Sequence, residues 1–574
     1  MIKKPHITVA VLAIATLLSI GRAGAQVAPP AIPAPAVPDA GQILKPAPEA
    51  RPAAPSPVMP APGGALPDTR LEGTHVRFQA VRVSGATVVS TEAIAAIFAP
   101  LRDKNVSAEA LRACLDQVQT LYADAGYPLG RAYIPAQRLQ GRTLTVRIVE
   151  GYIANLAVQS DSDKTRRLVE GMAAPLTAEK PLTGKTLQRV LLLLQDIPGI
   201  TLGSRFQAMD PQTGATTLLL AAKITPLSAT FYMDNRANLD GLPVQPYLIA
   251  AANNLFGAGD QLSLTALLSP RQKDYAFYSL GYSQFVGTDG LNMGLNASWA
   301  QSLDERTFAP FPVRSQTSQL SHTARYPVIR GTERQFNLDG KLYFTHAGYS
   351  FAGIPIARDN FTALRLGGDY ARSLSDAAAF GGSLHLTQGL FDTGGAAHTR
   401  GAALANFTKL HADARLVYKV TGEFSLNLRA AGQYGSGSLF ASEEINFGGL
   451  QYGRGFDTSE LAGDSGFGLT FQPEYTFAFS QADFGLGAGL AVTPFMMVDY
   501  AKTYNSPGDG QAKGELLSAG LGVRLAVAKL ATVTLELAKP VNRKPFYRRD
   551  RAPRFYVGLE FGMDQAYRLM AGNL

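Results

Sequence analysis

Apolar and polar residues alternate almost without interruption from Pro226 onward, and this pattern constrains the fold more than any other feature of the chain. In the segment 333–346, for example, Phe336, Leu338 and Leu342 alternate with polar and charged residues. Because successive side chains of a β-strand point to opposite faces, the pattern predicts strands with one apolar and one polar face. Segments of roughly ten such residues are typical of a membrane-spanning β-barrel, whose strands face lipid on one side and a wet lumen on the other.

The number and spacing of these segments also favour a barrel. About sixteen antiparallel strands can be counted, an even number as in bacterial outer-membrane barrels. We place them at 226–235, 245–253, 259–269, 274–286, 290–301, 316–327, 333–346, 361–373, 376–389, 404–419, 422–434, 466–479, 490–501, 515–527, 530–540 and 553–563. Short connectors alternate with long ones, as expected for turns on one side of a membrane and loops on the other. A soluble β-sandwich or propeller is the alternative, and the uniform strand lengths and the lack of disulfides argue against it.

The N-terminus carries a secretory pattern. Lys3 and Lys4 precede an apolar run over residues 7–20, and small residues at 23–25 form a cleavage site. The run is shorter than the roughly 20 residues that a membrane helix needs. We therefore interpret 1–25 as a signal peptide and the Pro/Ala-rich segment 26–74 as a largely disordered arm. An exported barrel of this kind is expected in a Gram-negative outer membrane.

Two small α+β modules lie between the arm and the barrel, which begins at residue 225. Residues 75–151 and 152–224 each show the order strand, helix, helix, strand, strand, so a tandem repeat is the simplest account. Thr183 and the three residues after it, Gly184-Lys185-Thr186, imitate the end of a nucleotide-binding loop, but Glu179 stands where that loop needs its first glycine. We expect Thr183 to cap a helix instead.

The stretch 446–466 is rich in glycine and separates two strongly alternating segments. Because glycine loosens the backbone and permits positive φ, we expect neither helix nor strand there. Arg454 stands between Gly453 and Gly455 and is followed by Phe456, an arrangement that delivers a cation on a tight turn. Loops this long are usually functional or disordered. We predict that segment 436–465 folds into the barrel and docks Arg454 there.

The strands after this loop offer carboxylates for Arg454. Alternation puts Glu474 on the lumen face of one strand and Asp499, with Phe495 and Met497, on the lumen face of the next. A charge-assisted contact in a shielded lumen would fix the loop. We expect Asp499 to be the main partner and Glu474 the second choice. The alternative is that all three charges are solvated groups of an ordinary pore.

Enzymatic, metal-binding and nucleic-acid-binding functions find little support. The single cysteine, Cys114, excludes a disulfide within the chain, and the seven histidines form no ligand pair at helical spacing. No Ser/His/Asp set falls in one loop cluster, so we expect no catalytic residues, no metal and no cofactor. The net charge is +8, but the only basic run, 539–554, has the position of a loop between strands, so we expect no nucleic-acid partner.

The inner loop, the strands and the two modules resemble those of the two-partner secretion transporters, the TpsB-type family that includes ShlB, FhaC and HecB. This family lies within the superfamily of POTRA-plus-barrel outer-membrane proteins. The run Gly453-Arg454-Gly455-Phe456 is similar to that family's loop motif, and Asp464 and Gly466 are similar to its loop end. In the first module Tyr133, Pro135 and Gln137 resemble the family's POTRA motif. Three features depart from the family. Gly453 replaces a branched residue, Ala501 stands where glycine is usual, and the chain continues past the last strand through 564–574.

The resemblance implies a function in protein transport. The POTRA modules would capture an unfolded, β-rich exoprotein in the periplasm, and the barrel would conduct it outward without nucleotide hydrolysis. Further partners would be outer-membrane lipids and the barrel assembly machinery that inserts the protein itself. An N-terminal plug helix, frequent in the family, could form only at 39–44. Two alternatives are an outer-membrane barrel assembly factor, which usually has more POTRA modules, and a passive porin, which would leave the two modules unexplained.

Overall fold

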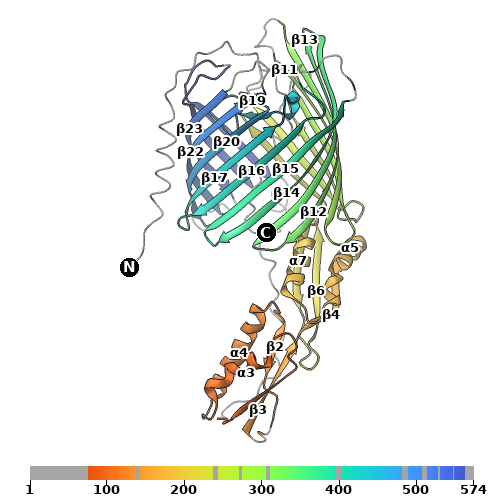
Figure 1. Ribbon diagram of the computed structural model, residues 1–574, viewed down its shortest axis with the longest axis vertical. Helices are drawn as coiled ribbons and strands as arrows, with labels where there is room; N and C mark the ends of the chain where they lie inside the picture. Colours follow the sequence, from red (N-terminus) through yellow and green to blue (C-terminus); the bar gives the residue numbers. More distant parts are fainter. Residues whose placement is uncertain are drawn as a thin grey trace, which may run out of the picture.

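The computed structural model describes residues 75–562, apart from 138, 140–141, 237–243, 270–274, 305–310, 393, 395–397, 399, 401–402, 481–488, 507–513, 528–529 and 547. The predicted signal peptide, the Pro/Ala-rich arm, the segment 39–44 and the tail 564–574 lie outside the described residues. Two small domains and a barrel follow one another along the molecule (Figure 1). No helix among the described residues is long and apolar enough to span a membrane.

The first module is a three-stranded sheet covered by two helices. Its elements are β1 (Ala80–Ser84), α3 (Thr91–Phe98), the 3-10 turn η1 (Ala99–Leu101), α4 (Ala108–Asp124), β2 (Gly130–Tyr133) and β3 (Thr143–Glu150). The central strand β3 pairs parallel with β1 and antiparallel with β2. The side chains of Ser90 and Ser107 accept hydrogen bonds from the first turns of α3 and α4, which is why the helices begin there.

Glu150, at the end of β3, ties the first module together. Its carboxylate accepts hydrogen bonds from the backbone N–H groups of Thr87 and Val88, at 2.7 and 3.1 Å, and from the Tyr122 hydroxyl at 2.8 Å. Burial opposes ionisation of this carboxyl, but these hydrogen bonds outweigh burial and lower the pKa of Glu150. The ionised carboxylate therefore holds the β1–α3 connection against α4.

The second module has the same order of strands with one more helical turn. Its elements are β4 (Tyr152–Ser160), α5 (Asp163–Ala173), α6 (Pro175–Ala178), α7 (Gly184–Gln195), β5 (Ile200–Phe206) and β6 (Ala215–Ile224). The sheet order is β4-β6-β5. The Thr183 hydroxyl accepts a hydrogen bond from the Thr186 N–H at 3.2 Å, so the residue caps α7 as expected.

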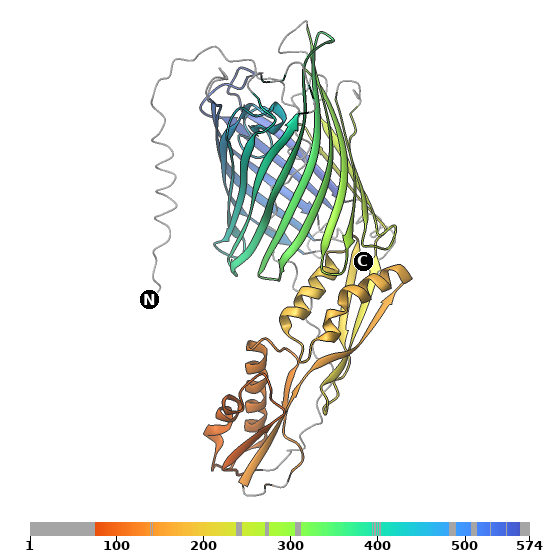
Figure 2. The ribbon, with the colours of Figure 1, turned by 45° about the vertical axis from the view of Figure 1, so that its right-hand side comes forward.

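The two modules share buried residues. Leu129, from the end of the first module, belongs to the apolar core of the second. The backbone N–H of Gly184 donates to the carbonyl of Gly126 at 2.8 Å. A Cβ at Gly151 would lie 2.7 Å from the Cβ of Leu129, so only glycine fits this junction. The contacts make the two modules one arm (Figure 2).

The rest of the described chain forms a closed antiparallel barrel of sixteen strands, if β20 and β21, which pair with the same neighbour, count as one. Its strands are β7 (Leu227–Asp234), β8 (Gln245–Asn253), β9 (Gln261–Leu267), β10 (Ala276–Val286), β11 (Leu291–Asp304), β12 (Val313–Arg330), β13 (Arg334–Phe351), β14 (Ile354–Ser375), β15 (Ala378–Asp392), β16 (Thr408–Lys419), β17 (Phe424–Gly435), β20 (Ser465–Tyr475), β21 (Phe477–Phe479), β22 (Leu490–Tyr504), β23 (Gly514–Val527), β24 (Ala531–Pro540) and β25 (Arg554–Gly562). The last strand pairs with the first. The predicted barrel is therefore confirmed.

The alternation places the faces as predicted. In β22, Pro494, Met496 and Val498 are exposed on the outside, whereas Phe495 and Asp499 are buried inside. The sequence places one strand end at 346 and the next strand start at 361, but β13 runs to Phe351 and β14 begins at Ile354. At the end of β13 the lumen-facing Ala347 and Tyr349 are apolar and buried, whereas the outward-facing residues are Gly348 and Ser350. The apolar-outward alternation that marks a lipid-facing strand is therefore lost there although the pairing continues.

The arm docks on the barrel through the second module. The Asp196 carboxylate, just after α7, binds the Arg330 guanidinium at the end of β12 through two contacts of 2.7 Å. Arg189 on α7 donates to the carbonyl of Pro327 at 2.9 Å and pairs with Asp289 at 3.0 Å. Helix α7 and strand β12 lie next to each other where the arm meets the barrel in Figure 1.

Candidate functional site

The loop between β17 and β20 fills part of the barrel interior and carries the predicted site. It contains a short 3-10 turn, η3 (Ala441–Glu443), and two three-residue strands, β18 (Ile445–Phe447) and β19 (Leu461–Gly463), which pair antiparallel. The prediction that 446–466 contains no strand is therefore wrong at its edges, because the neighbouring apolar residues pair across the loop's neck. Figure 1 shows β19 within the outline of the barrel.

Glycines shape the tip of the loop. Gly448, Gly449 and Gly453 have φ of 110°, 90° and 89°, a region that residues with a Cβ rarely adopt. Gly455 has a different reason to be glycine. A Cβ there would lie 2.6 Å from the backbone carbon of Lys539 and the nitrogen of Pro540, so the tip touches the backbone at the end of β24.

Arg454 makes a bidentate ion pair with Asp499 on β22. Its Nε and Nη2 lie 3.0 and 2.9 Å from the two carboxylate oxygens, and the backbone N–H of Arg454 also donates to Asp499 at 3.0 Å. The Asp499 side chain is fully buried and that of Arg454 is 7% exposed, so the two charges compensate each other away from water.

Neighbouring strands complete the contacts of this pair. Asp499 accepts hydrogen bonds from the hydroxyls of Thr470 on β20 and Ser518 on β23, and Arg454 donates to Gln472 at 2.9 Å. Glu474 lies further along β20, 3.3 Å from Gln472, and Gln472 stands between it and Arg454. Asp499 therefore contacts Arg454 directly, whereas Glu474 is connected to Arg454 only through the Gln472 side chain.

Phe456 lies in an apolar cluster beside the ion pair. It is buried together with Phe447 and Tyr452 of the loop and with wall residues that include Leu516 on β23. Gly453 approaches the same leucine, since a Cβ there would lie 2.9 Å from Leu516 Cδ1. The tip is therefore held by packing as well as by charge.

Asp464 anchors the other end of the loop. Its carboxylate accepts hydrogen bonds from the backbone N–H groups of Leu439 and Ser506, at 2.8 and 2.9 Å, and binds the Arg400 guanidinium. Arg400 also pairs with Glu444 at 2.8 Å. Burial raises the pKa of Glu444 to about 7, although Arg400 opposes the shift.

Gly466 lets the loop pack against the wall beneath this anchor. A Cβ there would lie 2.6 Å from the carbonyl oxygen of Lys502 and 3.2 Å from the side chains of Ile445 and Phe447. A larger residue would therefore separate the loop's neck from the barrel wall.

The three residues of the POTRA-like motif lie far from the loop, at one edge of the first sheet. Tyr133 is buried at the end of β2, and Pro135 is half-buried after it. The Gln137 amide accepts from the N–H of Thr145 and donates to its carbonyl, both at 2.8 Å. The Gln137 side chain therefore continues the pairing of β2 along β3.

Sequence reasoning missed several charged residues that face the loop. Arg400 belongs to a different connector from Asp464. Arg554 is the last residue of the basic run 539–554, whose middle part connects β24 and β25 as expected, and it is the first residue of β25. Arg554 donates to Asp457 of the loop at 2.6 Å. Asp457 comes directly after the segment Gly453–Phe456, and this position is the only sign in the sequence that its carboxylate belongs to the site.

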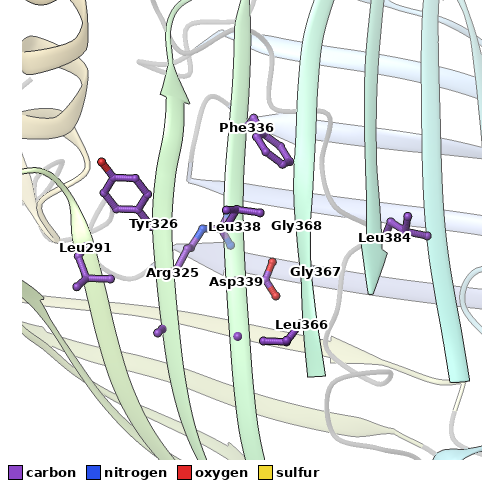
Figure 3. A pocket seen from close by; sticks show the side chains of 12 residues that line it. Leu291, Arg325, Tyr326, Phe336, Leu338, Asp339, Leu366, Gly367, Gly368 and Leu384 are labelled. Carbon is purple, nitrogen blue, oxygen red and sulfur yellow. The ribbon is translucent and has the colours of Figure 1, made fainter. Parts of the chain in front are cut away.

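Two further features of the described residues concern metal ligands and a surface hollow. Among the residues described, no group of three or more His, Cys, Asp or Glu side chains could hold a metal ion. A hollow of about 680 Å³ lies over β11 to β15, and the exposed side chains of Leu338, Leu366 and Leu384 line it beside Gly368 (Figure 3). Because these leucines lie on the outer apolar face, the hollow belongs to the lipid-facing surface.

Comparison with known proteins gives two family matches. The model described as haemolysin secretion/activation protein ShlB/FhaC/HecB matches residues 217–525, and the model described as POTRA domain, ShlB-type, matches residues 76–151.

Curated relatives and solved structures agree with these matches. The heme/hemopexin transporter protein HuxB of Haemophilus influenzae is 21% identical over 477 residues, which cover 79% of this chain and 81% of HuxB. The outer membrane transporter CdiB of Dickeya dadantii is 22% identical over 510 residues, 86% of this chain and 88% of CdiB. The structure of CdiB from Escherichia coli has a TM-score of 0.65 at 16% identity and covers 88% of this chain and 94% of that one.

Proposed function

The chain belongs to the ShlB/FhaC/HecB family of haemolysin secretion/activation proteins, the two-partner secretion transporters of the outer membrane, and we propose that it captures one specific unfolded exoprotein and conducts it through its barrel. As a member of this family it is an outer-membrane transporter for secreted proteins, with its POTRA modules in the periplasm. The proposal rests on how the arm, the barrel and the inner loop are arranged. A two-module arm is docked at one mouth of a barrel whose lumen holds a loop fixed by a buried ion pair.

Capture would use an exposed sheet edge in the arm. Strand β5 pairs with β6 along one side, and no strand lies on its other side among the described residues. An edge of this kind offers backbone N–H and C=O groups to an extended peptide, which can add as a further strand. Thr201, Gly203 and Arg205 on β5 are exposed, so a partner strand could reach this edge.

Conduction would proceed without nucleotide hydrolysis. Thr183 caps helix α7, and this structural role explains why the sequence there imitates a nucleotide-binding loop. The driving force would then come from folding of the exoprotein outside the cell, where apolar burial makes its return unfavourable. Transport by the purified chain in proteoliposomes, with no nucleotide added, tests this part.

The loop would act as the closure of the channel. Arg454 and Asp499 hold its tip against β22, and Asp464 holds its end, so the loop has two separate anchors. We propose that the loop stays docked at rest and is displaced when the exoprotein enters. The other proposed partners are the lipids around the barrel and the assembly machinery that would recognise the last strand, β25, with Phe561 near its end.

Site-specific photo-crosslinking in cells tests the capture step. A photoreactive residue in place of Thr201 on the β5 edge should trap one large secreted protein. The same residue in place of Glu109, which is exposed on α4, is the matched control and should trap none of it. Many trapped barrel precursors would instead indicate an assembly factor, and no trapped protein at either position would favour the porin.

A further inference from the structure

The barrel closes through a short ladder. The last strand, β25, pairs with the first, β7, at five positions, from Gly558–Asp234 to Gly562–Thr230, whereas it pairs with β24 at eight. With β20 and β21 counted as one strand, this is the shortest ladder between barrel strands in the part of the chain that the structure describes. Because ladder hydrogen bonds join neighbouring strands, this seam has the least backbone support.

Asn235 extends the seam by one step beyond the end of β7. Its side-chain oxygen accepts from the N–H of Val557 at 2.9 Å, and its side-chain nitrogen donates to the carbonyl of Phe555 at 3.2 Å. The Asn235 side chain therefore makes the two hydrogen bonds to β25 that the backbone of a further strand residue would make. The backbone N–H of Asn235 also donates to the carbonyl of Val557 at 3.3 Å. Beyond the five-position ladder, the start of β25 is therefore joined to the end of β7 by this one backbone bond and the Asn235 side chain.

Arg236 then crosses over β25 to reach β24. It forms an ion pair of 2.9 Å with Glu536 on β24, and its guanidinium carbon lies 4.2 Å from the centre of the Tyr556 ring on β25. Glu536 and Tyr556 are register partners in the β24–β25 ladder. One arginine at the end of the first strand therefore binds both of the last two strands.

The inner loop joins the same group of charges. The Nη1 atom of Arg454 lies 3.7 Å from Glu536, and Asp457 accepts a hydrogen bond of 2.6 Å from Arg554 at the start of β25. The side chains of Asp457 and Arg554 are 2% and 4% exposed. With so little access to water, either charge would be poorly compensated if the other moved away.

We propose that the docked loop braces the barrel seam. We use the term seam brace for four residues, Arg236, Asp457, Glu536 and Arg554. Asp457 and Arg554 connect the loop to β25, and Arg236 and Glu536 connect the end of β7 to β24. Displacement of the loop removes the Arg554–Asp457 and Arg454–Glu536 contacts together, so the β25–β7 ladder loosens whenever the loop leaves. This step deepens the proposed function, since it assigns a structural consequence to the loop displacement on which transport would rest.

Hydrogen exchange on the purified full-length protein in detergent tests the brace without any exoprotein. Asp457→Asn and Arg554→Gln should speed amide exchange in β7 and β25 at least tenfold and leave β12 and β13 unchanged. Arg325→Gln is the matched control, since Arg325 on β12 pairs with Asp369 on β14 at 2.6 Å and so also bridges past one strand. In Arg325→Gln, the backbone amides of β7 and β25 should exchange at the wild-type rate.

A charge exchange separates the ion pair from a general loss of stability. The double variant Asp457→Arg/Arg554→Asp should recover wild-type protection of β7 and β25 if the pair itself supports the seam. Unchanged exchange at the seam in both single variants would overturn the proposal, as would equal acceleration in all strands. Since no secretion is measured, failure of the proposed transport function would leave these results unaffected.

Discussion

Replacement of Arg454 by alanine should release the loop and leave the barrel inserted in the membrane. The substitution removes both side-chain contacts to Asp499 and the contact to Gln472, while the backbone N–H of residue 454 remains. Removing one partner of a buried ion pair costs about 3–5 kcal/mol. Asp499 keeps the hydroxyls of Thr470 and Ser518, so we take the lower end. About 3 kcal/mol lowers the ratio of docked to released loop roughly 100-fold.

Limited proteolysis and hydrogen exchange of the loop measure this ratio. Cleavage and exchange within 446–463 should become much faster in Arg454→Ala, and secretion should fall. Amide exchange in β12 and β13, which lie away from the β25–β7 seam, should stay at the wild-type rate, because the variant touches no hydrogen bond between those strands.

The control for this prediction is Arg524→Ala. Arg524 also lies on the lumen side, but its side chain is 37% exposed and 3.7 Å from Glu474, a pair of the kind that contributes about 1 kcal/mol or less. Loop protection in Arg454→Ala equal to that of this control, or normal secretion, would refute the role given to the Arg454–Asp499 pair.

Three further changes probe the arm, its docking and the loop tip. Glu150→Gln removes an ionised acceptor of several hydrogen bonds and should destabilise the first module by about 1–3 kcal/mol in thermal unfolding of the full chain. Because folding lowers the pKa of Glu150, its stabilisation is complete above the ordinary value of 4.5 and is lost as the pH falls below it, so the wild type and the variant should converge in acid. Arg330→Ala breaks the contact with Asp196 and should broaden the distances between spin labels on the arm and the barrel. Gly455→Ala places a Cβ against the backbone of β24 and should displace the tip and lower secretion.

Matched controls accompany the last two changes. Arg166→Ala breaks exposed pairs within α5 and should leave the spin-label distances unchanged. Gly437→Ala adds a Cβ in the same loop with nothing within 4 Å and should secrete normally. Equal effects of the test and control variants would show that docking, or the close approach of the tip, has been misassigned.

The sequence by itself determined the barrel, the two modules and the lumen side of Asp499. These follow from local rules, since a period of two assigns each residue of a strand to a face whatever its neighbours are. The glycines around Arg454 likewise mark a turn, because positive φ is a property of single residues.

Only the tertiary structure decided which charges meet. The register pairs Thr470 with Asp499, while Glu474 is four residues further, roughly 13 Å along the strand, so a lumen-facing carboxylate can still miss Arg454. Arg400 and Arg554 reach the loop from connectors and strands distant in sequence. Such pairs depend on how the barrel closes and how the loop folds back inside it, and no local pattern records either.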